Sequence, residues 1–133
     1  MAKGRRVFQL KTFSRWARGV LTHEQLCAAA REVIDGRYEA DLGGGVCKKR
    51  IAVSGQGKSG AARTLIARKH QDAVFFVAGR EKNDPGTDFS DKQVEAAKLV
   101  AKGLQAANEE MLERLLAAGT IQEICNDTPP PQE

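Results

Sequence analysis

The sequence predicts an α+β domain in which one strand and two helices precede three consecutive strands, followed by further helices. Residues 46–82 contain three short apolar runs broken by polar or glycine-rich segments, which is typical of neighbouring strands. Residues 22–36 and 89–119 instead repeat their apolar side chains at helical spacing. A length of 133 residues, with 41% hydrophobic and 29% charged residues, fits one soluble globular domain with its own core.

The N-terminal part is predicted to form one strand and two helices. Residues 5–12 (RRVFQLKT) alternate apolar and polar side chains, which indicates a half-buried strand. A short helix is expected over 14–19, with Ser14 as its cap. The second helix has sharper limits, because Thr22 and Gln25 have the spacing of a capping box and Gly36 suits a left-handed end.

Three strands are predicted after the glycine run at 41–45, which we interpret as a flexible lead-in. The strands are expected over residues 46–53, 61–69 and 73–81. On the first of them, a period of two places Lys48 and Arg50 on one face. Cys47 and Lys49 fall on the opposite face, which is expected to pack against the helices.

The C-terminal part is predicted to be mainly helical. Ser90 and Gln93 repeat the capping-box spacing, so a third helix is expected to run to about residue 105. A fourth helix is expected over 108–119, with an asparagine cap and a glycine stop, and a short strand over 120–125. The final segment, 126–133, contains three consecutive prolines and is predicted to be a disordered tail, so that residues 1–125 form the domain.

The cysteines and the hydropathy pattern indicate the cellular compartment of the protein. Cys27, Cys47 and Cys125 are odd in number and form no CxxC pair, so we expect reduced thiols in a cytoplasmic protein. Cys47 is expected to pack as a small hydrophobic residue. The sequence lacks an apolar run near the roughly 20 residues of a membrane span and lacks a signal-peptide pattern, so no membrane contact is expected.

Positive charge is concentrated in residues 43–82, although the whole chain carries a net charge of only +4. The basic residues there are Lys48, Lys49, Arg50, Lys58, Arg63, Arg68, Lys69, Arg80 and Lys82. Only Asp72 and Glu81 oppose them. One interpretation is a solvated, charged face of a sheet. The other is an anion-binding surface, because unpaired like charges repel unless a polyphosphate such as RNA neutralises them.

Other chemical motifs are weak. The segment 55–60 (GQGKSG) resembles a phosphate-binding P-loop, but Ala52 stands where that pattern needs glycine, and a strand rather than a helix is expected to follow. A flexible hairpin turn is the better interpretation, in which Lys58 can meet a phosphate as a mobile cation. His23 and His70 are the only histidines, and no metal site, cofactor site or nucleophile–base pair is predicted.

These segments together resemble the HigB branch of the RelE-like toxins of bacterial type II toxin–antitoxin systems, within the RelE/ParE superfamily. The likeness covers roughly residues 5–124. It is strongest over 41–69, where LGGG-x-x-KKR, GxGKSG and R-T-L-I-A match in sequence and spacing. The resemblance implies a RelE-like fold: a small twisted antiparallel sheet in β-α-α-β-β-β order, helices on one face, C-terminal helices, and RNA on the concave other face.

The resemblance also implies a function. The chain is expected to be a metal-independent endoribonuclease, an mRNA interferase that cuts mRNA on the ribosome and inhibits translation. A helix-turn-helix antitoxin is expected to neutralise it, so that the toxin exists as a free monomer or within a toxin–antitoxin hetero-oligomer. Many relatives carry a C-terminal tyrosine, whereas Tyr38 is the only tyrosine here. Phe89 can stack on a base but cannot transfer a proton.

The resemblance also implies which residues form the site, from their positions relative to the family's motifs. Lys48 and Arg50 match the first basic pair of the family, Arg63 matches a phosphate-contacting arginine, and Lys82 or Arg80 lies near the basic residue after the last strand. Arginine suits charge stabilisation because it binds two phosphate oxygens at once, so Arg50 and Arg63 take that role. A lysine among cations suits proton transfer, so Lys48 is the candidate base and Lys82 the candidate acid. Further RNA contacts are expected from Lys49, Lys58, Arg68, Arg80 and Phe89.

Two other functions stay open at this point. One is a superfamily member that inhibits another target or has lost catalysis. The other is an RNA-binding or ribosome-associated module without activity. Only the nuclease is expected to create discrete new 5′ ends in cellular mRNA.

Overall fold

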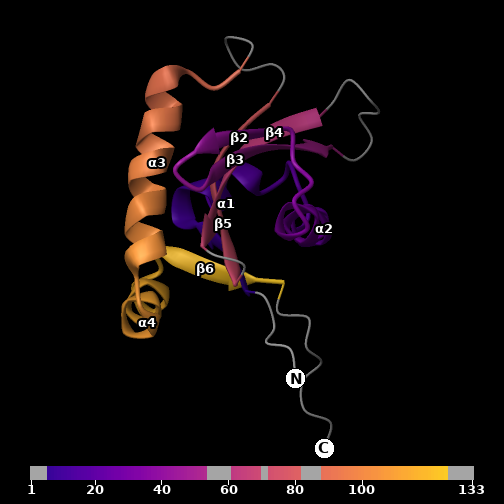
Figure 1. Cartoon of the computed structure of the whole chain (residues 1–133). Helices are drawn as coiled ribbons and strands as arrows, with labels where there is room; N and C mark the ends of the chain where they lie inside the picture. The colour runs from indigo at the N-terminus through magenta and orange to yellow at the C-terminus, as the bar shows by residue number, and fades with distance from the viewer. Residues whose placement is uncertain (1–5, 54–60, 70–71, 82–87, 126–133) are drawn as a thin grey trace, which may run out of the picture.

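The computed structural model describes residues 6–53, 61–69, 72–81 and 88–125, which form a six-stranded sheet and four helices (Figure 1). The elements in chain order are β1 (Arg6–Leu10), α1 (Lys11–Ala17), α2 (His23–Ile34), β2 (Ala40–Gly43), β3 (Val46–Ala52), β4 (Ala61–Lys69), β5 (Ala73–Arg80), α3 (Asp91–Ala106), α4 (Glu109–Ala118) and β6 (Ile121–Ile124). The predicted α+β class is confirmed.

The sheet has the strand order β2-β3-β4-β5-β1-β6 and is mixed. Strands β2 to β5 form an antiparallel meander, and β6 is antiparallel to β1. The pair β1–β5 is parallel, so the prediction of a wholly antiparallel sheet is wrong for this pair. The reason is topological: α1 and α2 carry the chain to the far edge, and the meander that returns ends with β5 in the direction of β1.

The glycine run forms a tight hairpin rather than the predicted flexible lead-in. β2 pairs with β3, and Gly43, Gly44 and Gly45 between them all have positive φ, at 88°, 63° and 79°. Glycine adopts this region without the penalty that a Cβ imposes. Gln105 of α3 fastens the turn by donating from Nε2 to the carbonyl oxygens of Gly44 and Arg68, at 3.1 and 3.0 Å.

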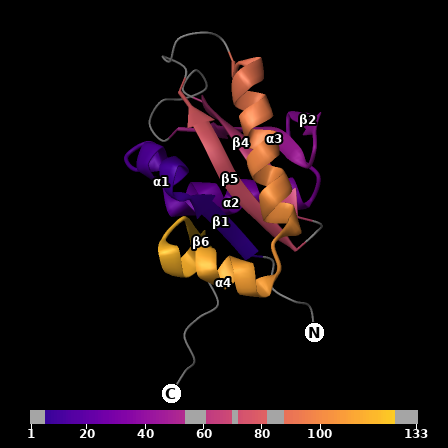
Figure 2. The same ribbon diagram turned by 90° about the vertical axis from the view of Figure 1, so that its left-hand side faces the viewer.

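Helices cover both faces of the sheet, each over a separate core. Figure 1 shows α2 and α3 on opposite sides of the strands, and Figure 2 views the sheet from the α3 side. The core under α1 and α2 includes Phe13, Leu26, Val33, Ile66 and Phe76. The core under α3 and α4 includes Phe8, Leu65, Phe75, Leu104 and Leu112. The prediction that the second face stays open is therefore wrong over much of its area, because the buried stripe of α3 needs an apolar partner.

Local capping signals set most helix limits as predicted. Thr22 and Gln25 form a reciprocal capping box at α2, and Ser90 and Gln93 form another at α3. At α4, the Asn108 side chain accepts from the N–H of Met111, and Gly119 ends the helix with φ of 78°. The prediction for α1 is wrong at its start, because the helix begins at Lys11 and Ser14 bonds a carbonyl inside it.

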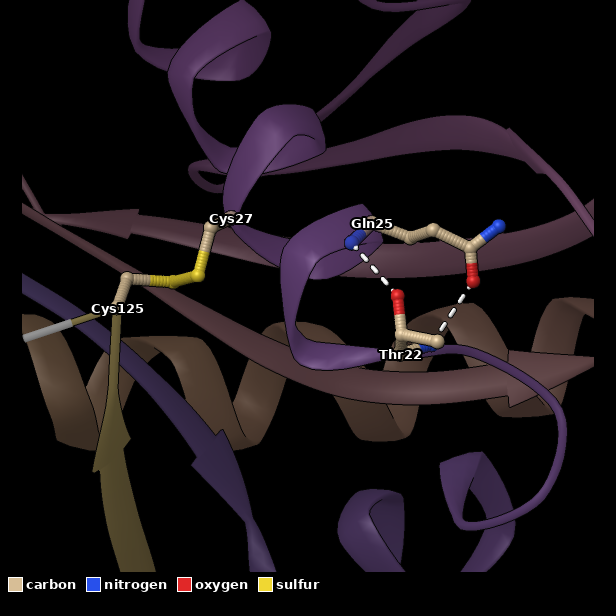
Figure 3. Close-up of a disulfide and its surroundings, with 4 residues drawn as sticks. All are labelled: Thr22, Gln25, Cys27 and Cys125. Carbon is tan, nitrogen blue, oxygen red and sulfur yellow. Dashed lines mark hydrogen bonds between the residues drawn. A yellow bond between two sulfur atoms is a disulfide. The ribbon is translucent and has the colours of Figure 1, made fainter. Parts of the chain in front are cut away.

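Cys27 of α2 and Cys125 after β6 form a disulfide (Figure 3). The prediction of three reduced thiols is therefore wrong for this pair. The two residues lie 98 positions apart in sequence, and only the pairing of β6 beside β1 brings them together. Cys47 is a buried free thiol in the core, as predicted, and desolvation raises its pKa to about 11.

A close contact between Gly79 and Trp16 gives a stability prediction. A Cβ at position 79 would overlap the six-membered ring of Trp16, because its nearest ring carbon would be only 2.1 Å away. We expect Gly79→Ala to lower the free energy of unfolding by about 1–3 kcal/mol, measured by urea denaturation, because overpacking displaces the ring. Gly103→Ala is the matched control. A Cβ there has open space within a helix, so this change is expected to stabilise the protein by up to about 1 kcal/mol. Equal effects of the two changes would contradict the packing argument.

Candidate nucleic-acid interface

Three arginines lie side by side across the centre of the sheet. Arg50 of β3 is directly opposite Arg63 of β4, which is directly opposite Arg80 of β5. Cross-strand partners project to the same face, so the three guanidinium groups share one side. Lys48 lies on the same face two residues before Arg50, as the period of two predicts. We call Lys48, Arg50, Arg63 and Arg80 the basic row.

A β-bulge brings Arg80 into this row. The register between β4 and β5 shifts where Ile66 faces Phe76 but Leu65 faces Ala78, which leaves Val77 as an extra residue. An unbroken register would place Gly79 opposite Arg63 and would turn Arg80 to the other face, under α1. Bulges often redirect a side chain near a functional site. The same register shift turns Gly79 to the opposite face, where it lies against Trp16. One bulge therefore sets the positions of Arg80 on one face and Gly79 on the other.

The basic row lies beyond the N-terminal end of α3, on the face that this helix covers. Arg50 is exposed and Arg63 is half-buried. Among the residues that the structure describes, neither forms an ion pair with a carboxylate. Arg80 is buried and donates from Nη1 to the backbone carbonyl oxygen of Asp88, at 2.7 Å. Two of the three arginines can therefore bind an external anion.

Asp88 supplies a carboxylate inside this row, immediately before α3. It forms an ion pair with the Nζ of Lys48, and its Oδ1 accepts from the N–H of Phe89 at 2.7 Å. Desolvation raises the pKa of Asp88, but the bonds from Lys48 and Phe89 and the nearby charge of Arg63 outweigh it, and the net pKa is lowered. Asp88 is therefore ionised at neutral pH and is a carboxylate partner of Lys48 that the sequence analysis missed.

The geometry of the row fits a polyanion. The family model for the RelE toxin of RelE/RelB toxin–antitoxin systems matches residues 5–124. The chain belongs to the RelE toxin family. This membership makes it a toxin of a toxin–antitoxin system, with an antitoxin as its partner. A search of curated proteins gives no match.

Two of the expected RNA contacts of this RelE-family toxin lie away from the basic row. Lys49 is only 7% exposed on the α2 face, where its Nζ lies 2.5 Å from Glu32 and donates to the Arg37 carbonyl oxygen at 3.1 Å. Arg68 lies on that face too, with its guanidinium carbon 5.1 Å from the centroid of the Tyr38 ring and 3.6 Å between Nη2 and an oxygen of Asp41. We interpret both residues as structural.

The remaining expected site residues divide into two groups. Phe89 follows Asp88, is half-buried, and packs at the edge of the core under α3, next to the row. Lys58 and Lys82 lie outside the described residues. Within the described ranges, no three or more side chains of His, Cys, Asp and Glu gather into a metal-binding group, and no helix is long and apolar enough to cross a membrane.

The Asp88 carboxylate leads to a binding prediction for this RelE-family toxin. We expect Asp88→Asn to raise the affinity for single-stranded RNA by roughly tenfold, because the change frees Lys48 for a phosphate. The slope of log affinity against log salt is expected to steepen by about 0.7, which corresponds to one further phosphate contact on a single strand. Fluorescence anisotropy with a 2′-O-methyl RNA, which lacks the 2′-hydroxyl nucleophile, measures both quantities.

Glu95→Gln is the control for that experiment. It removes the same charge from an exposed side chain of α3 whose nearest cation is Lys98 rather than a member of the basic row. Equal gains in affinity for the two variants would show that only net charge matters, and would contradict a specific role of Asp88.

Proposed function

We propose that this toxin is a cytoplasmic, metal-independent endoribonuclease of the HigB branch, which cleaves mRNA on the ribosome and thereby inhibits translation. The observation that carries the proposal is the alignment of Arg50, Arg63 and Arg80 on adjacent strands, with Arg50 and Arg63 not paired to a carboxylate within the described residues. The guanidinium groups of Arg50 and Arg63 suit a phosphodiester, because each can bind two phosphate oxygens and stays charged. The HigB assignment rests on the LGGG-x-x-KKR and GxGKSG segments.

The chemistry needs little beyond the basic row, because RNA carries its own nucleophile. The 2′-oxygen attacks the adjacent phosphorus, its proton passes to the neutral amine of Lys48, and the bond between the 2′-oxygen and phosphorus forms as the bond from phosphorus to the 5′-oxygen breaks. Arg63 and Arg50 stabilise the extra negative charge of the transition state. Lys82, as the acid, donates a proton to the leaving 5′-oxygen. The products are a 2′,3′-cyclic phosphate and a 5′-hydroxyl.

Asp88 has a place in this scheme as the anion that RNA displaces. In the absence of RNA its carboxylate neutralises Lys48 and lies near Arg63. An arriving phosphate competes for the same cations and releases Lys48 from the carboxylate. The Lys48 ammonium then gives a proton to water, and its neutral amine serves as the base. Phe89, the neighbour of Asp88, is proposed to stack on a base next to the scissile bond. These steps would couple binding of RNA to activation of the lysine.

Mapping of mRNA 5′ ends after brief induction tests the proposal. We expect discrete new ends within reading frames, at a fixed position relative to the codons, because ribosome-bound mRNA is presented in register. Each new end is expected to carry a hydroxyl, so that a linker ligates only after enzymatic phosphorylation. Arg114→Ala is the control, since this exposed arginine of α4 pairs with Glu110, far along the chain from the row.

The outcomes separate the alternatives. Growth arrest without new ends would contradict the nuclease and would favour a superfamily toxin that acts on another target. RNA binding without arrest or cleavage would favour a non-catalytic module. The partner is proposed to be a helix-turn-helix antitoxin, and co-expression with a small helix-turn-helix reading frame adjacent to this gene is expected to suppress both arrest and cleavage.

A further inference from the structure

The disulfide between Cys27 and Cys125 stands in contrast to the cytoplasmic location proposed for this toxin. The cytoplasm keeps most thiols reduced, and the disulfides that do form there are usually transient, catalytic or redox-sensing. A domain of 133 residues with a core on each face of its sheet is also large enough to fold without a covalent link. A permanent structural link is therefore not needed to explain this pair.

Both cysteines of the disulfide are partly exposed to solvent. Cys27 and Cys125 are half-buried, whereas Cys47, the free thiol, is 0% exposed. Ala28, the residue that follows Cys27 on α2, is exposed as well. Thiol–disulfide exchange needs a thiolate to reach one of the two sulfurs, so access decides which cysteines react. The bonded pair is therefore the more accessible to soluble thiols and disulfides.

The backbone of Cys125 is strained. Its φ is 62°, in the left-handed region, and it is the one non-glycine residue with positive φ in the described part of the chain. A Cβ makes this region unfavourable, and such a conformation persists only where the surrounding structure imposes it. The covalent link to Cys27 is a restraint that acts on this residue. Reduction lets the backbone relax, which favours the reduced form and makes the disulfide easier to open.

The element that the disulfide fastens is the edge strand β6. This strand has four residues, lies at the end of the sheet and pairs with β1 (Figure 3). Its other attachments include the buried side chains of Ile121 and Ile124 and the ion pair between Glu123 and Arg6, at 2.9 Å. Short elements with few buried contacts are the ones that open locally with the least free energy. Loss of the link is therefore expected to release β6 before the central strands.

The disulfide lies apart from the basic row. In the strand order, β1 separates β6 from β5, the nearest strand of the row. Cys125 packs against the core under α1 and α2, and Cys27 belongs to α2, whereas the row lies on the face that α3 covers. A change in the redox state of this pair is therefore expected to alter the opening of the C-terminal strand rather than the chemistry of the row.

We propose that Cys27 and Cys125 form a thiol–disulfide switch that sets how long the toxin survives proteolysis. In the reduced state β6 opens and proteases reach the C-terminal part of the domain. In the oxidised state the link to α2 holds β6 in the sheet. The switch rests on the proposed cytoplasmic location, and it goes beyond the proposed nuclease activity.

The oxidant of this switch is a low-molecular-weight disulfide of the glutathione type. The thiolate of one cysteine attacks a sulfur of the oxidant, forms a mixed disulfide and displaces one glutathione thiolate. The thiolate of the other cysteine then attacks the protein sulfur of the mixed disulfide and displaces the second glutathione thiolate. The protein loses two electrons and two thiol protons, and the oxidant becomes two molecules of reduced glutathione.

A redox titration of the full chain tests the equilibrium. The protein is brought to equilibrium in buffers with different ratios of reduced to oxidised glutathione, and free thiols are then alkylated and located by mass spectrometry. The pair is expected to be mainly reduced at the ratio of a growing cytoplasm and mainly oxidised after a shift to oxidised glutathione. Cys47 is the internal control, because its buried thiol is expected to stay unpaired throughout. A pair that stays oxidised in the reducing buffer, or reduced in the oxidising one, would overturn the proposal.

Proteolysis and hydrogen exchange of the two states test the lock. Thermolysin is expected to cleave the reduced wild type about tenfold faster or more, because cleavage follows the population of open molecules. In the reduced state, the amides of β6 that bond to β1 are expected to exchange roughly tenfold faster than those of β4, and oxidation is expected to narrow this difference. The Cys27→Ser, Cys125→Ser variant should match the reduced wild type in every buffer.

Equal cleavage of the two states, with an unchanged difference between β6 and β4, would overturn the lock. The comparison of the oxidised and reduced wild type needs no variant, so it stands even where the double variant fails to fold. RNA cleavage enters none of these measurements. Failure here therefore leaves the nuclease proposal intact, and failure of the nuclease proposal leaves these results unchanged.

Discussion

Arg63→Ala is expected to reduce the rate of RNA cleavage by about a hundredfold or more. Arg63 is the central member of the basic row, with Arg50 and Arg80 on the strands beside it, and it forms no ion pair within the described residues. Removal of a single preorganised donor to a transition-state oxyanion typically costs about 10²–10³ in rate. Single-turnover cleavage of a labelled mRNA in purified translation complexes measures the effect.

Controls separate catalysis from folding in that experiment. The Arg63 side chain is half-buried and lies next to exposed Arg50, so its truncation relieves repulsion and is expected to leave thermal unfolding nearly unchanged. Arg63→Lys keeps one charge but loses the two-pronged contact, and an intermediate rate is expected. Arg114→Ala should cleave as the wild type does. Full activity of Arg63→Ala would refute the central role of the row. Lys48→Ala is also expected to abolish cleavage, because it removes the proposed general base.

Loss of the disulfide is expected to give the largest change in stability. Cys27 and Cys125 are separated by 98 positions in the sequence, so the disulfide closes a long loop. A link of that length removes much conformational freedom from the unfolded chain, worth about 4–5 kcal/mol in the chain-entropy model. We expect the Cys27→Ser, Cys125→Ser variant to lose free energy of unfolding on that scale, measured by guanidinium denaturation. The slope against denaturant is expected to increase, because the unlinked chain exposes more surface.

A reducing agent supplies the matching control. It is expected to destabilise the wild type to the level of the double variant and to leave the double variant unchanged. The buried free thiol of Cys47, whose pKa is about 11, is expected to stay unreactive in the folded state under both conditions. Wild-type denaturation curves that coincide with and without reductant would contradict a disulfide in the protein in solution.

Sequence reasoning located the elements whose signals are local. The capping boxes at Thr22 and Ser90 and the glycine stop at Gly119 are short-range patterns, and the structure has all three. The side chains of Lys48 and Arg50 share a face because alternation is a property of a single strand. The β2–β3 hairpin was missed because the glycine run that favours flexibility also suits a tight turn.

Features that depend on pairing between distant segments could not be predicted from the sequence. Placement of Arg80 beside Arg63 needs the bulge at Val77, which belongs to the register of two strands rather than to either sequence. The disulfide needs β6 to lie beside β1. Among the features that were not predicted, Asp88 was the one site residue whose local sequence carried a usable signal. It is an acid that comes just before the Phe89–Ser90 helix start, close to the end of a basic strand.

The position of β1 in the sheet has a consequence for folding during synthesis. This first strand is inserted between β5 and β6, and Arg6 contacts Glu123 across 117 positions of sequence. During synthesis β1 must wait for partners that leave the ribosome much later, and such non-local pairing is slow. The sheet can close only after β6 has emerged. The order of synthesis therefore delays the complete sheet until β6 has been made.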